Sequence, residues 1–214
     1  MATSSSERPL LVLNSGSSTL KFSLFDVAAS AGPLLSVHGL VDGIGAQARL
    51  VIGDAAPQQA AGASDHAGAF TVMARWLDAE LGGAPPIAIG HRVVHGGTRW
   101  AGPVVVDDAV LANLEALTPL APLHQPQALA AIRGVRKRWP GVRQVACFDT
   151  AFHHGRGELA EAFALPRELF ESGVRRYGFH GISYEYIAGR LPRVAPHIAD
   201  ARVVIAHLGN GASL

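Results

Sequence analysis

The segment Leu10–Asp26, LLVLNSGSSTLKFSLFD, decides how this chain begins to fold. Its first four residues are apolar, and from Leu20 onward apolar side chains alternate with Lys21 and Ser23, which is the period of a half-buried strand. A short polar turn that contains Gly16 separates the two apolar runs. We therefore expect two strands joined by a tight turn at the start of the chain.

Strand and helix patterns alternate along the rest of the chain, and this alternation indicates an α/β protein. Apolar residues recur at helical spacing between Phe70 and Leu81, and paired glycines and prolines then end that helix. Further strands are expected near 34–40, 49–52, 87–94, 142–148 and 203–206, and helices at 65–81, 107–117, 126–139 and 183–191.

Composition excludes several classes of protein. A chain with 49% hydrophobic and 16% charged residues has enough apolar side chains for a buried core. The chain has 18 basic and 17 acidic residues and therefore a net charge of +1. This charge gives no electrostatic reason to expect nucleic acid or an anionic membrane as partner. The apolar runs are too short for a membrane span. The single cysteine, Cys147, and the Ser-rich residues 1–8, which lack an apolar signal segment, favour the cytoplasm.

The first turn carries groups that suit a phosphate. Gly16 allows the chain to turn tightly enough for backbone N–H groups to surround an anion. The pattern of a P-loop is absent, so a Walker-type site is not expected. A polar hairpin turn with an exposed lysine is the alternative. The groups in question are the hydroxyls of Ser15, Ser17, Ser18 and Thr19, the Lys21 ammonium, and the Asn14 carbonyl, which suits a hydrated magnesium ion.

Three further residues are candidates for chemistry, and each has a plain structural alternative. Arg92 lies within an apolar strand, where either a carboxylate or phosphate substrate or a structural Arg–Asp pair would satisfy its guanidinium. Asp149 ends the strand 142–148, where a carboxylate aligns a nucleophile or simply caps the next turn. His180 lies between glycines, either as a donor to a developing anion or as a loop histidine without a role.

The segment His207–Gly211, HLGNG, repeats the chemistry of the first turn after a second apolar run. Two such units in one chain predict two loops that face phosphate. Only three residues, Ala212 to Leu214, follow this turn, so its apolar return strand is missing. We therefore expect the 214 residues to be a fragment of a longer protein.

Six motifs, taken in this order, resemble the acetokinase family over nearly the whole chain: LLVLNSGSSTLKFSLFD, GHRVVHGG, APLHQPQ, FDTAFH, YGFHGISYEYIA and AHLGNGAS. The resemblance implies a ribonuclease H-like (actin-like ATPase) lobe with a mixed sheet and flanking helices, plus the start of a second similar lobe. Residues 1–150 are then the first lobe, and residues 151–214 begin the nucleotide-binding lobe.

The same resemblance implies a reaction and its components. It implies reversible, Mg²⁺-dependent transfer of the γ-phosphoryl group of ATP to acetate, giving acetyl phosphate and ADP. It also implies a homodimer in the cytoplasm. The isolated 1–214 chain is expected to be inactive, because further catalytic groups of the family lie beyond Leu214.

Roles for single residues follow from the resemblance as well. Asp149 is expected to be the catalytic aspartate, and His180 to stabilise the transferring phosphoryl group. Arg92 is expected to hold the carboxylate of acetate or acetyl phosphate, and Asn14 to accompany magnesium. The residues expected to contact the ATP phosphates are Ser17, Thr19 and Lys21 in the first turn, and His207, Leu208, Gly209, Asn210 and Gly211 in the second.

The chain departs from the family at two positions. Thr19 stands where serine is common, which keeps the hydroxyl, and Tyr184 stands where many members have histidine, which puts a role for that position in doubt. Two alternatives stay open. A propionate or butyrate kinase differs only in the acyl pocket, where a methylene discriminates by about 1–3 kcal/mol. A fragment that binds phosphate without turnover is the second.

Overall fold

The computed structural model describes residues 8–27, 32–209 and 211–214 of the chain. Asn210, expected to contact phosphate, and almost all of the Ser-rich N-terminus lie outside these residues. The chain divides into two compact units. The N-terminal unit comprises residues 1–93 and 104–146, and the C-terminal unit comprises residues 94–103 and 147–214.

The predicted hairpin is confirmed. Strands β1 (Leu10–Ser15) and β2 (Leu20–Asp26) pair in antiparallel register, and their alternating apolar residues are buried. The Gly16 N–H donates to the Thr19 carbonyl at 2.8 Å and closes the turn. A Cβ atom on Gly16 would lie 2.6 Å from Oγ1 of Thr19, so a larger residue here would force the Thr19 side chain to move.

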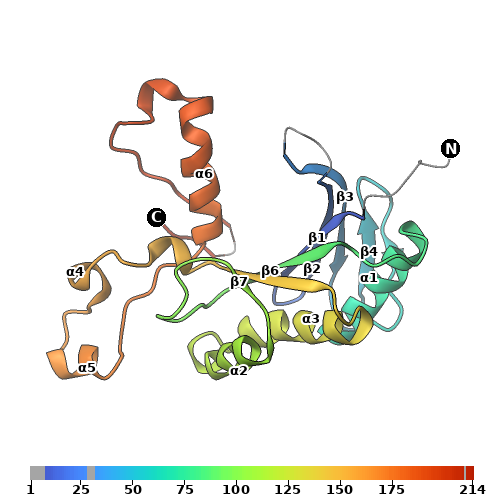
Figure 1. Ribbon diagram of the computed structural model, residues 1–214, viewed down its shortest axis with the longest axis horizontal. Helices are drawn as coiled ribbons and strands as arrows, with labels where there is room; N and C mark the ends of the chain where they lie inside the picture. The colour runs from blue at the N-terminus through green and yellow to red at the C-terminus, as the bar shows by residue number, and fades with distance from the viewer. Residues whose placement is uncertain (1–7, 28–31, 210) are drawn as a thin grey trace. The chain divides into compact units, whose positions relative to one another are not determined.

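The hairpin is part of a mixed eight-stranded sheet with the order β5-β4-β3-β2-β1-β6-β8-β7 (Figure 1). Strands β1 to β5 form an antiparallel series, whereas β6 joins β1 in parallel. A mixed sheet with flanking helices is the fold class expected from the sequence. The remaining strands are β3 (Leu34–Asp42), β4 (Arg49–Ile52), β5 (Gln58–Gln59), β6 (Ala88–Val93), β7 (Val104–Val105) and β8 (Arg143–Phe148).

Three helices of the N-terminal unit begin where the sequence predicts. Helix α1 (His66–Glu80) is capped by Asp65, whose Oδ1 accepts from the Gly68 N–H at 2.7 Å. Asp107 caps helix α2 (Asp108–Ala116) in the same way. A short 3₁₀ turn, η1 (Thr118–Leu120), and helix α3 (Gln125–Arg138), with proline in its first turn, follow.

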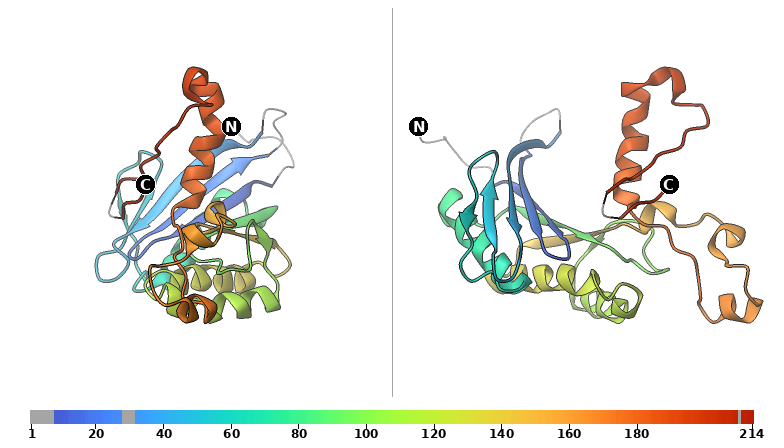
Figure 2. Two further views of the ribbon diagram at one scale, coloured as in Figure 1. Left: turned by 90° about the vertical axis from the view of Figure 1, so that its left-hand side faces the viewer. Right: turned by 180° about the vertical axis from the view of Figure 1, so that it is seen from behind.

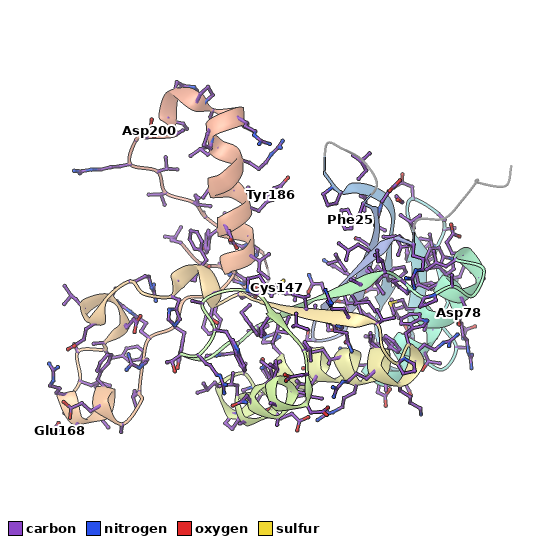
Figure 3. The ribbon with its side chains drawn as sticks, in the orientation of Figure 1. Phe25, Asp78, Cys147, Glu168, Tyr186 and Asp200 are labelled. Atoms are coloured by element: carbon purple, nitrogen blue, oxygen red, sulfur yellow. The ribbon has the colours of Figure 1, made fainter. Side chains whose placement is uncertain are left out.

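The core of the N-terminal unit lies between one face of the sheet and helices α1 and α3 (Figures 1 and 2). Phe22 of β2 packs against Trp76 of α1 with ring centroids 5.5 Å apart, and Phe70 contacts Trp139 at 6.0 Å. Side chains crowd this layer, and Asp78 on its outer side accepts from Arg138 at 2.6 Å (Figure 3). The burial of one sheet face leaves the opposite face of β1, β2 and β6 for polar residues.

The C-terminal unit contains short elements and one long helix. The helix α6 (Gly181–Val194) is predicted by the sequence, whereas the expected strand at 203–206 is wrong. Val204 is 80% exposed, and no strand in the described part of the chain lies beside these residues to supply hydrogen bonds, so apolar composition alone does not make a strand. The shorter elements are η2 (Ala151–His153), α4 (Glu158–Glu161), α5 (Arg167–Glu171) and η3 (Pro196–Ile198).

Candidate functional site

Lys21, Asn14 and Arg92 lie in one row across three neighbouring strands of the N-terminal unit. Asn14 of β1 is paired with Lys21 of β2 on one side and with Arg92 of β6 on the other. Paired residues project from the same face of a sheet, and this face is opposite to the one that buries Leu13 and Leu20. Sheet register therefore brings together three of the residues that the sequence singled out.

A hydrogen bond joins two members of this row. The guanidinium of Arg92 donates from Nη1 to Oδ1 of Asn14 at 3.0 Å, and both side chains are half-buried. This bond orients the plane of the guanidinium, which carries five N–H donors in a fixed geometry. The arrangement suits a planar, two-oxygen ligand such as a carboxylate.

The same bond decides how Asn14 fits a magnesium ion. Direct ligation by Oδ1 would place a dication beside the guanidinium of Arg92, whereas the second lone pair of Oδ1 can accept from a water molecule bound to the ion. Within residues 8–27, 32–209 and 211–214, three or more His, Cys, Asp or Glu side chains nowhere gather as a metal cage. Asn14 thus fits a hydrated ion reached through water.

Carbonyl groups of the first turn are tied back to the protein. The Gly16 carbonyl accepts from Nε2 of His66 at 2.8 Å, and the Ser18 carbonyl accepts from the Ile44 N–H at 3.0 Å. Ser17 and Ser18 are exposed, and Thr19 is half-buried. Because carbonyl oxygens repel anions, the engagement of these two by N–H groups of the protein favours an anion near the exposed Ser17 and Ser18.

Each histidine of the segment GHRVVHGG has a structural role within its own unit. His91 is buried, its Nε2 lies 2.8 Å from Oε1 of Gln144, and burial lowers its pKa to about 4 although the hydrogen bond opposes the shift. Burial also lowers the pKa of His95, whose Nδ1 accepts from the Gly97 N–H at 2.9 Å. Both rings are therefore neutral at pH 7 and are not candidate acids.

Asp149 and His180 are held close together by backbone in the C-terminal unit. Asp149 is 2% exposed, and its carbonyl accepts from the Gly181 N–H at 2.8 Å. A Cβ atom on Gly181 would lie 2.3 Å from that carbonyl oxygen, so glycine is required here. Among the described residues His180 alone combines a side chain with a positive φ, of 57°. Such strained backbone persists where the surroundings determine the conformation.

The imidazole rings of His180 and His207 are stacked. Their centroids are 4.1 Å apart and their planes differ by 12°. His207 begins the second predicted phosphate loop, in which Leu208 is 78% exposed and Gly209 and Gly211 are also exposed. The His207 N–H and carbonyl pair with the backbone of Ser213, both at 3.0 Å, which forms an antiparallel bridge between these two residues.

A cavity of about 250 Å³ lies beside Thr150 and His153 in the C-terminal unit. Its cationic side chains are engaged by the protein: Arg175 pairs with Glu161 at 3.0 Å, and Arg176 donates to the Ala160 carbonyl at 2.9 and 3.1 Å. These bonds brace the segment around α4 and α5. We assign the arginines a structural role rather than a catalytic one.

Cys147 is not a candidate nucleophile. Its thiol is half-buried, and burial together with the nearby Glu185 raises its pKa. The thiol is therefore protonated at neutral pH and is a weak nucleophile.

Sequence reasoning missed the groups that support the histidines. Gln144 holds His91, Thr150 accepts from the Gly96 N–H at 3.0 Å, and Ser213 contacts His180. Thr150 directly follows Asp149, so the motif FDTAFH contains a signal that could have identified it. The partner of His180 lies 33 residues along the chain, and no pattern in the sequence connects the two.

Comparisons with known proteins identify the family to which the chain is similar. A profile of the acetokinase family matches residues 9–214. Acetate kinases of Nitrobacter hamburgensis and Rhizobium meliloti are 47% and 49% identical over 212 residues, which is 96% of this chain and 52% and 53% of those proteins. The chain thus spans about half the length of the curated relatives it matches.

Solved structures give the same result. A propionate kinase from Francisella tularensis has a TM-score of 0.83 at 32% identity, and the acetate kinase of Porphyromonas gingivalis has 0.77 at 33%. Each alignment covers 96% of this chain and 53% of the solved chain. In the described part of the chain, no helix is both long and apolar enough to cross a membrane. With a family profile that matches nearly every residue and a fold that matches solved relatives, the chain belongs to the acetokinase family.

Proposed function

We propose that the protein carrying this chain is an acetate kinase, which transfers the γ-phosphoryl group of ATP reversibly to acetate and forms acetyl phosphate and ADP. The observation that carries the proposal is the row of Lys21, Asn14 and Arg92 across β2, β1 and β6. Two cations on either side of an amide, on an open sheet face, suit a reaction between a carboxylate and a phosphate. Membership of the acetokinase family supports the same reaction.

Arg92 binds the carboxylate in this proposal. A carboxylate oxygen of acetate forms the new P–O bond, the bond between the γ-phosphorus and the bridging oxygen breaks, and ADP leaves with that electron pair. The hydrogen bond from Arg92 to Asn14 holds the guanidinium in one orientation before acetate arrives. A prepositioned fork lowers the entropy lost when the two reactants meet.

The two turns bind the phosphates of ATP in this proposal. Lys21 neutralises phosphate charge, and the hydroxyls of Ser17 and Thr19 donate to phosphate oxygens. The segment His207–Gly211, with Leu208, Gly209 and Asn210, is the second phosphate loop. A magnesium ion, which Asn14 would hold through a water molecule, supplies neutralisation of phosphate charge when it is bound.

Asp149 and His180 act on the reacting groups in this proposal. His180 donates a hydrogen bond to the equatorial oxygens of the transferring phosphoryl group, where charge develops during transfer. Asp149, buried at the end of β8, aligns the reacting groups with its carboxylate. Neither role requires a covalent intermediate.

The organisation of the whole protein is part of the proposal. Residues 1–150 form the first, actin-like lobe, and residues 151–214 begin the second, nucleotide-binding lobe. The protein works as a homodimer in the cytoplasm.

The test is acyl phosphate formation by the full-length protein. ATP is supplied with acetate, propionate or butyrate, and the acyl phosphate is trapped with hydroxylamine. We expect the highest kcat/KM for acetate and no product without ATP. Absence of product with all three acids would contradict the proposed enzyme and favour a binding protein.

A propionate kinase is the second candidate, because the Francisella propionate kinase is a structural neighbour at a TM-score of 0.83. One methylene changes binding in a pocket by about 1–3 kcal/mol, or about 5- to 150-fold. A kcat/KM for propionate above that for acetate would therefore establish this alternative.

A further inference from the structure

Each ring of the stacked pair His180 and His207 contacts the hydroxyl group of a serine. Nδ1 of His180 lies 2.8 Å from Oγ of Ser213, and Nδ1 of His207 lies 3.2 Å from Oγ of Ser183. Ser183 belongs to the segment that begins with His180, and Ser213 belongs to the segment that begins with His207. Each segment therefore holds the ring contributed by the other.

Tyr184 extends one of these contacts into a chain of three groups. Its hydroxyl lies 2.6 Å from Oγ of Ser213, and the residue is 3% exposed. This is one of the two positions where the sequence departs from the pattern of the family. The structure gives the tyrosine a partner that itself contacts His180.

Backbone hydrogen bonds place these hydroxyl groups. The His180 carbonyl accepts from the N–H groups of Ser183 and Tyr184 at 3.0 and 3.2 Å, which forms the first turn of α6. The two backbone hydrogen bonds between His207 and Ser213 hold these two residues opposite each other. The hydroxyls are therefore held by main chain and not by flexible side-chain contacts alone.

Gly211 lies close to the Nε2 edge of the His180 ring. A Cβ atom on Gly211 would lie 3.5 Å from Nε2 and 3.6 Å from Cε1 of His180. A methyl group there would occupy room beside Nε2. The two nitrogens of His180 therefore have different surroundings: Nδ1 contacts the Ser213 hydroxyl, and Nε2 lies near Gly211.

We propose that Ser213, Tyr184 and Ser183 are positioning residues that fix the tautomer and orientation of the two imidazoles. The Tyr184 O–H donates to Ser213, the Ser213 O–H donates to Nδ1 of His180, and the proton of the neutral ring is then on Nε2. A neutral imidazole donates from only one nitrogen, so this chain makes Nε2 the donor. The inference rests on the proposed function, because it is through Nε2 that His180 would reach a phosphoryl oxygen.

The experiment combines kinetics with ¹⁵N NMR of the histidine rings in the full-length protein. Ser213→Ala and Tyr184→Phe each remove one hydroxyl. We expect kcat to fall about tenfold in Ser213→Ala and less in Tyr184→Phe, with little change in the KM for ATP or acetate. The His180 signals are expected to change from the Nε2–H tautomer to a mixture of the two tautomers.

Two further variants separate positioning from a general loss of structure. Ser213→Thr keeps the hydroxyl and is expected to recover most of kcat and the Nε2–H signature. Ser172→Ala is the matched control, because the Ser172 hydroxyl donates to the Leu169 carbonyl at 2.8 Å in the same unit and is exposed. It is expected to leave kcat and the His180 signals unchanged.

Wild-type kcat together with an unchanged Nε2–H signature in Ser213→Ala and Tyr184→Phe would overturn the inference. If Ser213→Ala does not fold, Tyr184→Phe and Ser213→Thr decide by the same two readouts. A wild-type protein that forms no acyl phosphate would instead remove the proposed function. The NMR comparison would still show whether the hydroxyl chain sets the tautomer.

Discussion

The row of Lys21, Asn14 and Arg92 and the pair of His180 and His207 are positioned by different means. The row sits on adjacent strands, where every residue is located by the hydrogen-bond ladder of its strand. The histidine pair sits on loops at the start of α6 and around residue 207, and side-chain hydroxyls hold the rings. Sheet register thus determines one set of groups, and a few individual contacts determine the other.

This difference predicts different responses to substitution. A ladder contains many bonds, so removal of one side chain from the row leaves the backbone of its neighbours in place. Each histidine ring, in contrast, contacts one serine hydroxyl, and His180 also has a strained backbone conformation. We expect substitutions in the row to lower activity without unfolding the sheet. For the histidine pair, we expect activity to fall also when the hydroxyl groups that contact the rings are removed.

The largest expected effect is the loss of kcat when Asp149 or His180 of the C-terminal unit is substituted. In the full-length protein, Asp149→Asn and His180→Ala are each expected to lower kcat about 100- to 1,000-fold, because each removes a contact made in the transition state. The measurement is hydroxamate formation at saturating ATP and acetate.

Matched controls lie in the same unit. Asp200→Asn and His197→Ala change exposed residues and are expected to keep wild-type kcat. Near-normal turnover in Asp149→Asn or His180→Ala would remove that residue from the mechanism.

The second prediction concerns acid sensitivity of the N-terminal unit through His91. Its native pKa of about 4 is below the ordinary 6.5, so the unfolded chain binds more protons between these pH values and the free energy of unfolding rises with pH. The contribution is complete above pH 6.5 and is lost as pH falls to 4, a change of about 3 kcal/mol. Urea denaturation between pH 4.5 and 7.5 measures it.

The variant His91→Gln has no titrating ring and is expected to flatten this pH dependence. The exposed His38 on β3 provides the control, because His38→Gln should leave the slope unchanged. An equal slope in wild type and His91→Gln would assign the acid sensitivity to other groups.

The third prediction concerns Arg92. Arg92→Ala is expected to raise the KM for acetate about 30-fold, or about 2 kcal/mol, and to lower kcat, with the KM for ATP little changed. Arg92→Lys should recover little, because an ammonium does not replace the planar fork. Steady-state kinetics of the full-length protein with each substrate varied provide the measurement.

Stability measurements complete this test. The exposed Arg49 of β4 is the matched control, and Arg49→Ala should leave both KM values unchanged. An Arg92→Ala protein that fails to fold would indicate a structural role for the arginine in the sheet.

The smallest expected effect contrasts two helix starts. Asp65 caps α1 through its side chain, whereas the N-cap of α6 is His180, without a side-chain capping bond. Asp65→Ala is expected to lower the free energy of unfolding by about 1 kcal/mol, and Asp65→Asn by less. Asp54→Ala, at an exposed turn, is the control for urea denaturation. A loss equal to that of the control would show that the cap does not stabilise α1.

Much of the fold of the N-terminal unit could be predicted because its information is local. Alternating residues from Leu20 to Phe25 specify a strand, and Asp65 and Asp107 mark helix starts where they lie in the structure. The strand expected at 203–206 is wrong because propensity describes one segment and a strand requires a second.

The candidate site could be predicted as a set of residues but not as an arrangement. Asn14 and Arg92 are 78 positions apart, and nothing in either segment specifies that β1 and β6 are neighbours in that register. The contacts of Ser213 with His180 and Tyr184 join two loops, whose geometry follows from tertiary packing. The residue types therefore predict the kind of chemistry, whereas the distances between these residues depend on the topology of the fold.

The turn that joins β1 to β2 makes segment length part of the chemistry. Surface turns usually accept insertions, because an extra residue costs little loop entropy. Here Lys21 lies directly opposite Asn14, and the two strands alternate between core and polar faces. One inserted residue between Gly16 and Thr19 that slipped the pairing by one position would set Lys21 against a core-facing residue and Leu20 against Asn14. An engineer must therefore keep the number of residues in this loop, in addition to the side chains that are proposed to bind phosphate.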